Sequence, residues 1–232
     1  MNKYILALFF LFIFPCSYSQ FYEDFSDKEL LNNPTWNGNV DSFTVNNALQ
    51  LQLNATVAGT AYLSSMAKTV HGKTEWSFWI KLAFAGSNNN YAKFYIASNT
   101  ENLIDTALEG YYLRFGENGN ADAIRFYKQS GNQHQLLMSG KDSAIANSFS
   151  IFVKIIYSDS GYWQLFTANE DEKVFLLENE CQDSMHFEMT HLGIVCTYTK
   201  SNSTKFYFDD IYCDEIYIDK EPPYIDSLYI DE

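Results

Sequence analysis

The chain has 232 residues, and its 29 Asp and Glu against 15 Lys and Arg give a formal net charge of −14. This acidity argues against a nucleic-acid ligand, because phosphate backbones are bound through Lys and Arg. The length suits one large all-β domain or two small ones. Abundant Phe (19) and Tyr (17) with scarce Pro (4) favour β-sheet. The acidity itself requires no role beyond solubility.

Residues 1–19 carry the pattern of an export signal peptide. Lys3 supplies a short positive segment, residues 4–14 form an unbroken apolar run, and Ser17-Tyr18-Ser19 is a small-x-small cleavage pattern before Gln20. The apolar run is too short to span a bilayer. We therefore expect an exported protein, extracellular or at the cell surface, with no transmembrane segment in the mature chain. Loss of Lys3 would change the charge from −14 to −15.

The mature chain reads as a succession of short strands. An Asn-Asn-Pro turn and a loop occupy residues 32–38, and polar loops are expected at 86–90 and at 99–109, the second with room for one helical turn. An Asn-Gly hairpin turn is expected at 117–120. The expected strands are residues 43–45, 48–53, 61–64, 75–84, 91–98, 110–116, 123–129, 135–138, 149–157, 162–168, 174–177, 191–199 and 205–212.

The segment 75–84, EWSFWIKLAF, shows the strand pattern most clearly. Large apolar residues recur at every second position, as in a strand with one face on a core. The opposite face carries Trp79 and Lys81. Because no long amphipathic helix accompanies these strands, the chain predicts an antiparallel β-sandwich or jelly roll with little or no helix.

The end of the chain departs from this pattern. Pro222-Pro223 breaks the alternation, and the residues after it are short and acidic. We therefore expect the sandwich to occupy residues 20–218, and residues 219–232 to be a linker or the start of a following segment.

The cysteines point to a fold held by its core. Cys16 could carry a lipid, but Pro15 stands where a lipoprotein signal has a small residue, so simple export is expected. Cys181, Cys196 and Cys213 remain in the mature chain, and three cysteines allow at most one disulfide. The last two lie in apolar strand patterns and are expected to be buried free thiols. No Cys/His pair has zinc spacing.

Four segments carry a resemblance to a known family: FYEDFSD at 21–27, WSFWIKLAF at 76–84, GYYLRFGE at 110–117 and KFYFDDIY at 205–212. Together they resemble the concanavalin A-like lectin/glucanase jelly roll. More narrowly, they are similar to a module found at the N-terminus of exported or surface-anchored bacterial multidomain proteins. The resemblance implies an antiparallel β-sandwich over most of the mature chain. It is more specific for fold than for activity.

The glucanase branch of that fold uses Glu-x-Asp-x-x-Glu on one strand, because hydrolysis needs two carboxyl groups flanking the scissile bond. The chain has no such spacing. The acidic runs at 169–172 and 178–180 are interpreted as solvated turns. Other catalytic motifs, such as G-x-S-x-G and H-E-x-x-H, are also missing from the sequence, and His71, His134, His186 and His191 are scattered. The protein is therefore expected not to be an enzyme.

A candidate ligand surface follows from strand alternation. If four successive strands are neighbours, their outward faces combine aromatic rings, which stack on sugars, with cations, which bind hydroxyl or carboxylate groups. Such a set suits a polysaccharide or surface glycan, and the gathered cations favour an anionic one. Two alternatives are cation–π pairs on a solvated sheet and a face covered by a loop or a neighbouring domain. The residues are Trp79, Lys81, Lys93, Tyr95, Tyr112, Arg114, Arg125 and Tyr127.

A candidate metal site lies where the first and last strands meet. The resemblance implies that these strands are adjacent and that an acid of the closing FYFDDI motif holds a structural Ca²⁺ with an early acid. Calcium takes six to eight oxygen ligands, so backbone carbonyls would complete the set. The alternative is that these acids end strands and cap turns. The residues are Glu23, Asp24, Asp209 and Asp210.

Three functions remain open from the sequence. The first is an exported, non-catalytic glycan-binding or adhesion module. The second is a structural spacer or interaction domain of a larger cell-surface protein. The third is a glycan hydrolase or lyase with an unrecognised site.

Overall fold

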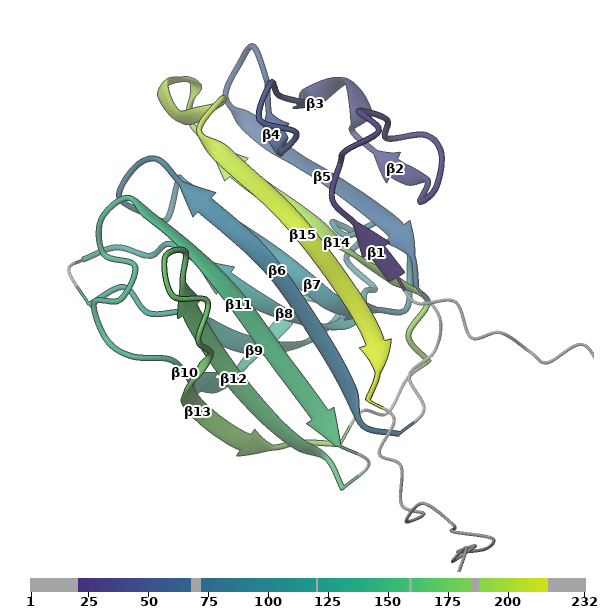
Figure 1. The fold of residues 1–232 in the computed structure, drawn as a ribbon, viewed down its shortest axis with the longest axis vertical. Coiled ribbons are helices and arrows are strands. Elements are labelled where there is room, and N and C mark those ends of the chain that lie inside the picture. The colour runs from purple at the N-terminus through teal and green to yellow at the C-terminus, as the bar shows by residue number, and fades with distance from the viewer. Residues whose placement is uncertain (1–20, 68–71, 120, 159, 185–187, 217–232) are drawn as a thin grey trace, which may run out of the picture.

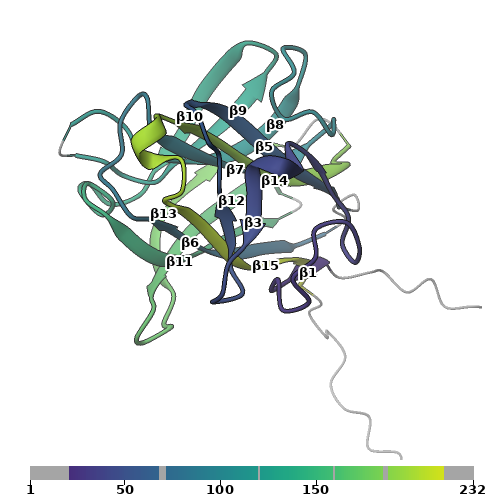
Figure 2. The same ribbon diagram turned by 90° about the horizontal axis from the view of Figure 1, so that it is seen from above.

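The computed structural model describes residues 21–67, 72–119, 121–158, 160–184 and 188–216. The expected signal peptide and the expected segment 219–232 lie outside these residues. The described chain forms two antiparallel sheets packed face to face, which Figure 2 shows as two layers. Its only helical elements are two 3-10 turns, η1 (Val40–Ser42) and η2 (Lys200–Asn202). The prediction of an all-β antiparallel sandwich is confirmed.

Sheet A has the order β13-β12-β11-β6-β15-β4-β3, with β1 beside β15 (Figure 1). Its strands are β1 (Phe21–Glu23), β3 (Phe43–Val45), β4 (Leu51–Leu53), β6 (Thr74–Leu82), β11 (Phe149–Ser158), β12 (Tyr162–Asn169), β13 (Leu176–Gln182) and β15 (Phe206–Glu215). Sheet B has the order β10-β9-β8-β7-β14-β5-β2. Its strands are β2 (Trp36–Gly38), β5 (Gly59–Met66), β7 (Tyr91–Ser98), β8 (Glu109–Phe115), β9 (Arg125–Ser130), β10 (Gln133–Ser139) and β14 (His191–Tyr198).

The core lies between the sheets and follows the predicted alternation. In β6 the inward residues Trp76, Phe78, Ile80 and Leu82 are fully buried. The Phe78 ring stacks on Phe94 of sheet B with centroids 3.7 Å apart. Burying a side chain of this size contributes roughly 1.5–3 kcal/mol, so the paired inner faces hold the sandwich together. The described cysteines are free, and Cys196 and Cys213 are buried among these apolar residues, as expected.

Several local predictions were wrong. Residues 36–38, expected in a loop, form β2 on the edge of sheet B. The acidic run 178–180, expected as a turn, lies within β13, where it pairs with β12. The connection 99–108 contains no helical turn. For residues 36–38 and 178–180, pairing with a neighbouring strand outweighed the local polarity of the sequence.

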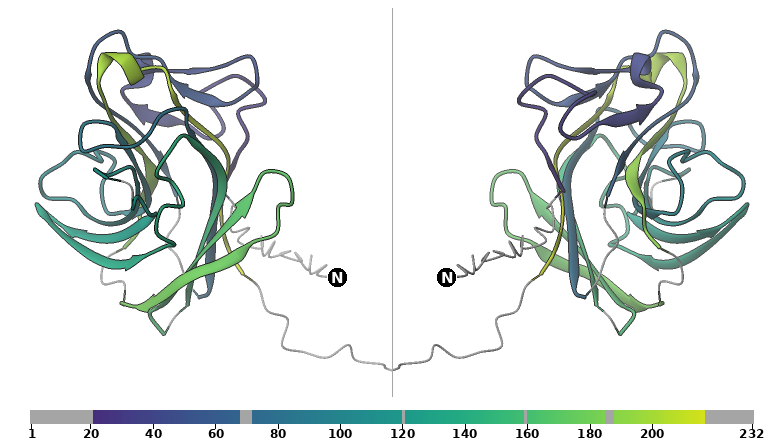
Figure 3. Two further views of the ribbon diagram at one scale, coloured as in Figure 1. Left: turned by 90° about the vertical axis from the view of Figure 1, so that its left-hand side faces the viewer. Right: turned by 90° about the vertical axis from the view of Figure 1, so that its right-hand side faces the viewer.

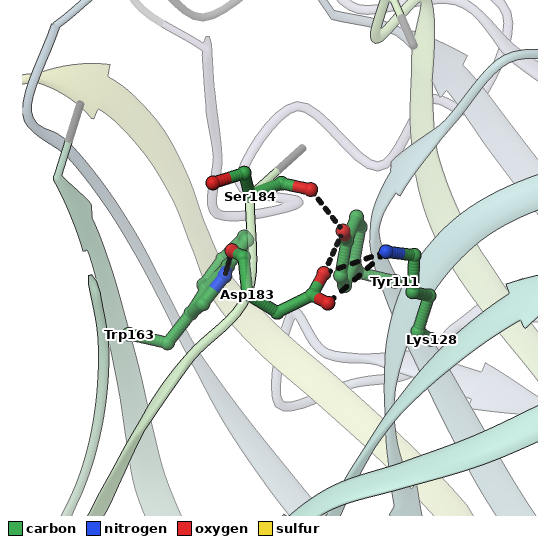
Figure 4. Close-up of polar contacts among 5 residues, drawn as sticks. All are labelled: Tyr111, Lys128, Trp163, Asp183 and Ser184. Atoms are coloured by element: carbon green, nitrogen blue, oxygen red, sulfur yellow. Dashed lines mark hydrogen bonds and ion pairs between the residues drawn. The ribbon is translucent and has the colours of Figure 1, made fainter. Parts of the chain in front are cut away.

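A polar cluster joins the two sheets at one end of the sandwich (Figure 4). The Lys128 ammonium and the Tyr111 hydroxyl, from β9 and β8 of sheet B, both donate hydrogen bonds to Asp183. Trp163 of β12 donates its indole N–H to the Asp183 carbonyl over 2.7 Å. Burial, followed by the neighbouring Asp183, raises the pKa of Tyr111. The Asp183 carboxylate has both a cation and a hydroxyl as partners, so its charge is satisfied within the protein. We therefore interpret the cluster as a structural connection between the sheets.

Candidate functional site

The eight candidate ligand residues do not form one surface. Trp79 and Lys81 lie on β6 in sheet A, whereas the other six lie on β7, β8 and β9 in sheet B. The prediction that the four strands are neighbours was wrong, because the connection at residues 83–90 carries the chain from one sheet to the other. The outward direction of all eight side chains agrees with the predicted alternation, since the intervening residues form the core.

Sheet B brings the remaining six residues together as two rows across three strands. Tyr95, Tyr112 and Tyr127 are cross-strand neighbours, with Tyr95 and Tyr112 ring centroids 5.0 Å apart and Tyr112 and Tyr127 centroids 5.2 Å apart. We call these three residues the tyrosine row. Lys93, Arg114 and Arg125 occupy the adjacent positions on the same strands and form the cation row.

The cation row sets like charges directly opposite each other, which is unfavourable in a sheet. Two of its members have partners: Arg125 forms an ion pair with Glu117 over 2.8 Å, and Arg114 lies over the Tyr91 ring at 4.3 Å. Lys93 differs, because its ammonium lies over the Tyr112 ring at 4.5 Å and has no hydrogen bond or ion pair within the described residues, whereas Arg114 also donates to the Gly116 carbonyl over 3.2 Å. Lys93 therefore has the most capacity for an external anion among the three cations.

A cleft of about 210 Å³ opens beside Lys93 of the cation row and Tyr95 of the tyrosine row. The connection between β7 and β8 forms one wall, with Leu103 and Leu108 packed against Tyr95, Tyr112 and Val195. The rest of the lining is mostly polar and aromatic, and includes Tyr91, Lys93, Asp105, Gln129 and His134. The cleft thus combines one apolar wall with hydroxyl, amide, imidazole and ammonium groups and one carboxylate.

Hydrogen bonds fix the orientation of the tyrosine row. The Tyr95 hydroxyl donates to the Gln129 side chain over 2.6 Å, and the Tyr112 hydroxyl lies 3.1 Å from His134 Nδ1. Sequence reasoning missed Gln129 and His134. Gln129 has the same strand parity as Arg125 and Tyr127, which could have identified it, whereas no spacing in the sequence places His134 of β10 beside the rows. His134 had been noted only as a scattered histidine.

Burial changes the protonation of the cleft. Burial first, and the nearby Arg114 second, lower the pKa of Lys93 to about 8. The pKa of His134 is lowered by burial and then by Lys93 and Arg114. Burial raises the pKa of Tyr95 and of Tyr112. Near neutral pH the cleft therefore presents a protonated lysine, a neutral imidazole and neutral phenols.

The two residues on sheet A have different surroundings. Trp79 is 5% exposed, and its indole N–H donates to Glu170 over 2.6 Å. Glu170 belongs to the loop between β12 and β13, which stands out beside sheet A in Figure 3. This arrangement corresponds to the alternative in which a loop covers the face. Lys81 is exposed, and its ammonium lies 5.7 Å from the Tyr207 ring centre.

The first and last strands lie side by side, as the resemblance implied, with Tyr22 opposite Tyr212. The acids there are poorly suited to calcium. Both oxygens of Glu23 are already used, by the Phe25 N–H at 2.7 Å and the Trp36 indole at 3.1 Å. Asp24 accepts from the Ser26 N–H, the turn-capping alternative. Within the described residues, no group of three or more acidic, His or Cys side chains is placed to hold a metal.

Asp122 is another buried acid, which the sequence did not single out. It is 1% exposed, and neither carboxylate oxygen has a hydrogen-bond partner. Burial raises its pKa, whereas the nearby Arg125 and Arg114 oppose the rise. One carboxylate compensated by two guanidinium groups does not supply the oxygen ligands that calcium requires. The described residues therefore do not fit a calcium ion at this position either.

Comparison of the structure with solved structures found several similar folds. A legume lectin-like domain from Entamoeba histolytica has a TM-score of 0.59 at 12% identity, covering 87% of this chain and 99% of that one. The exoplasmic domain of VIP36 in its Ca²⁺- and mannose-bound form has a TM-score of 0.57 at 10% identity, covering 80% and 84%. Lectin II from Ulex europaeus has a TM-score of 0.59 at 11% identity, covering 84% and 97%.

The chain has the concanavalin A-like lectin fold. Searches against protein-family models and against curated protein sequences found no match. At these identities the likeness establishes the lectin fold alone, so the function must be argued from the site. In the described part of the chain, no helix has the length and apolar character needed to cross a membrane.

Proposed function

We propose that this protein is an exported, non-catalytic glycan-binding module that takes an acidic saccharide on the outward face of sheet B. The observation that supports this most directly is the cation row beside the tyrosine row, at the edge of a cleft of about 210 Å³. The similar structures are described as carbohydrate recognition domains and lectins, and the VIP36 domain was solved with mannose. Their described role is binding, which favours a binding function here.

The chemistry of the face fits a sugar that carries a carboxylate or sulfate. The half-buried Tyr127 ring at the outer end of the tyrosine row offers a surface for the C–H face of a pyranose. Lys93 lacks a carboxylate partner and offers a charge-assisted hydrogen bond to an acidic group. The Gln129 and His134 side chains add polar groups beside it. The proposal uses no calcium, since neither Glu23 nor Asp122 fits that ion.

The rival is a spacer or interaction domain, and one observation favours it. All three cations of the row already lie near a ring or an acid: Lys93 over Tyr112, Arg114 over Tyr91 and Arg125 beside Glu117. A face satisfied in this way can be a solvated sheet with no ligand. Binding measurements therefore decide between the two functions.

The test compares the effects on glycan binding of substituting Lys93 on sheet B and Lys81 on sheet A. We expect the mature chain to bind acidic polysaccharides more tightly than neutral ones on a glycan array, and Lys93→Gln to weaken binding roughly 10-fold or more, since a hydrogen bond to a charged group contributes about 1.5–3 kcal/mol. Lys81→Gln removes the same charge from sheet A and should change affinity less than about twofold. Equal losses in both variants would indicate non-specific attraction, and no binding to any glycan would favour the spacer.

Two conditions sharpen the assignment. Added salt should weaken binding, because charges at the edge of the cleft are screened over about 8–10 Å. Binding should also weaken as pH rises through about 8, where Lys93 loses its proton. Lys93→Arg should keep binding at pH 9 because guanidinium stays charged. Retention of full wild-type affinity at pH 9.5 would exclude Lys93 as the anion contact.

Export is tested independently. We expect the protein, expressed with residues 1–19, to be found outside the cytoplasm with its N-terminus at or near Gln20. Mass spectrometry of the exported form measures this directly. An intact Met1, or a lipid on Cys16, would contradict the proposed processing.

A further inference from the structure

The outward face of sheet A carries a second recess, separate from the cleft on sheet B. It encloses about 380 Å³ and has an aromatic lining from Tyr22, Phe152, Phe175 and Tyr212. We call it the aromatic trough. Lys173 lines it too, with its ammonium 4.9 Å from the Phe152 ring centre, and two acids, Glu75 and Asp210, also lie in the lining. The proposed glycan-binding function makes no use of this recess.

Large apolar side chains are exposed next to the trough. Val174, Leu176 and Leu177 are 59%, 67% and 50% exposed, and Phe175 between them lines the trough. Three exposed apolar residues around a half-buried phenylalanine form a patch of the kind that marks a binding surface on a soluble protein. The trough and the patch therefore point to an occupant with apolar side chains.

Cations are placed over the aromatic rings of this surface. Lys154 lies 4.2 Å from the Phe175 ring centre, and its ion pair with Glu75 is long, at 3.8 Å. Lys173 has no carboxylate partner in the described part of the chain. An occupant with carboxylates beside its apolar groups would complement both lysines.

The chain itself contains such a segment. Residues 217–232 read YIDKEPPYIDSLYIDE, with Tyr-Ile-Asp three times, at 217–219, 224–226 and 229–231. Five acids and one lysine give this segment a net charge of −4. It follows Ile216, whose N–H is bonded to Lys73 at the end of β15, the strand that supplies Tyr212 to the trough. An extended segment of this length reaches about 50 Å, enough to return along sheet A.

We propose that residues 217–232 dock in the aromatic trough, with Tyr and Ile side chains against its rings and Asp side chains paired with Lys173 and Lys154. The covalent connection favours this occupant, because a segment attached beside its site acts at an effective concentration near the millimolar range. A segment held in this way covers the exposed apolar patch beside the trough. It also leaves the cleft on sheet B open for a ligand.

Competition between attached and free segments tests the proposal. A fluorescent peptide with the sequence of residues 217–232 is titrated against two chains that span residues 20–232: the wild type, and a variant carrying Tyr224→Ser, Ile225→Ser and Tyr229→Ser. We expect the peptide to bind the variant at least 10-fold more tightly, because the attached wild-type segment competes for the trough. Equal affinity for both chains, or no binding to either, would overturn the proposal.

Substitutions in the trough locate the site. Adding Lys173→Glu to the segment variant should lower peptide affinity at least 10-fold, whereas Lys200→Glu, at η2 away from the trough, should leave it unchanged. Both lysines are exposed, so neither change disturbs the core. The main competing occupant of the trough is a second copy of the chain, and light scattering tests for it. A dimer found in both the wild type and the segment variant would show that a second copy, and not the chain's own segment, covers the trough.

Discussion

Asp209 lies on the outward face of sheet A beside Trp79 and has an unusual environment for an acid. Its cross-strand partner is Trp79, and the register of β15 shifts just after it. Burial raises the pKa of Asp209 to about 7, and the negative charges of Asp210, Asp24 and Glu23 act in the same direction. The Asp210 N–H, which donates to the Asp209 carboxylate over 2.9 Å, opposes the rise. The folded protein therefore holds a proton that the unfolded chain releases.

This difference makes stability depend on pH. The ordinary pKa of the group is 3.8, so between about pH 4 and pH 7 the folded state binds more protons, and the free energy of unfolding falls as pH rises. A shift of about three units corresponds to roughly 4 kcal/mol as an upper limit. Because solvent reaches part of the side chain, about 1–2 kcal/mol is the expected loss. Asp209→Asn should remove this loss, so the variant exceeds the wild type in stability at pH 8 and matches it below pH 4.

Urea unfolding of both proteins at pH 4 to 8 measures the difference. Asp24→Asn is the matched control, since hydrogen bonds from Ser26 lower the pKa of Asp24 and its pH dependence has the opposite sign. A constant difference between wild type and Asp209→Asn across the range would refute the assigned pKa. Repeating the series with calcium tests the metal hypothesis. If calcium bound here, a hundredfold excess over the dissociation constant would stabilise only the wild type, by about 2.7 kcal/mol. Because Glu23 and Asp24 already accept hydrogen bonds, we expect no change on adding calcium.

Three further predictions concern packing and are measured by urea unfolding. Trp79→Ala should cost about 3–5 kcal/mol, because the side chain is 5% exposed and bonded to Glu170; a cost below 1 kcal/mol would mean that the loop does not cover it. Gly193→Ala should cost about 1–3 kcal/mol, because the added Cβ would lie 2.2 Å from the Leu63 carbonyl; unchanged stability would contradict this close approach. Lys128→Met should cost roughly 3 kcal/mol by leaving Asp183 without its cation, and adding Asp183→Asn should recover part of it; additive losses would argue against the pair.

Strand alternation was predictable because it depends on neighbours two residues apart. The inward Phe78 and the outward Lys81 follow from the sequence, and so do Phe126 and Tyr127. The assignment of strands to the two sheets could not be predicted, because it depends on whether each connecting segment returns to the same sheet or crosses to the other. Eight residues separate β6 from β7, and nothing in their composition distinguishes a hairpin from a crossing to the other sheet. The eight residues predicted to form one ligand surface therefore lie on the outward faces of two different sheets.

The cover over each face was also invisible in the sequence. Trp79 was expected at an open surface because strand alternation directs its side chain away from the core. In the structure its indole N–H donates a hydrogen bond to Glu170, which lies 91 residues later in the chain. Leu103 reaches the tyrosine row from a connection that looks polar as a whole. The position of such a loop depends on tertiary contacts made by single residues. The overall composition of the loop does not identify those residues.

The cation row gives the reason to test sheet B before sheet A for a saccharide. Placing Lys93 opposite Arg114, and Arg114 opposite Arg125, is unfavourable in an isolated sheet. Stability alone would be served by an acid or a neutral residue at the central position, and a chain with 29 Asp and Glu has many acids to supply. An anionic ligand would convert this repulsion into binding free energy. If the row is only a tolerated arrangement of charges, Arg114→Gln should leave saccharide affinity unchanged, whereas at a ligand site it should weaken binding, and glycan-binding measurements on this variant separate the two.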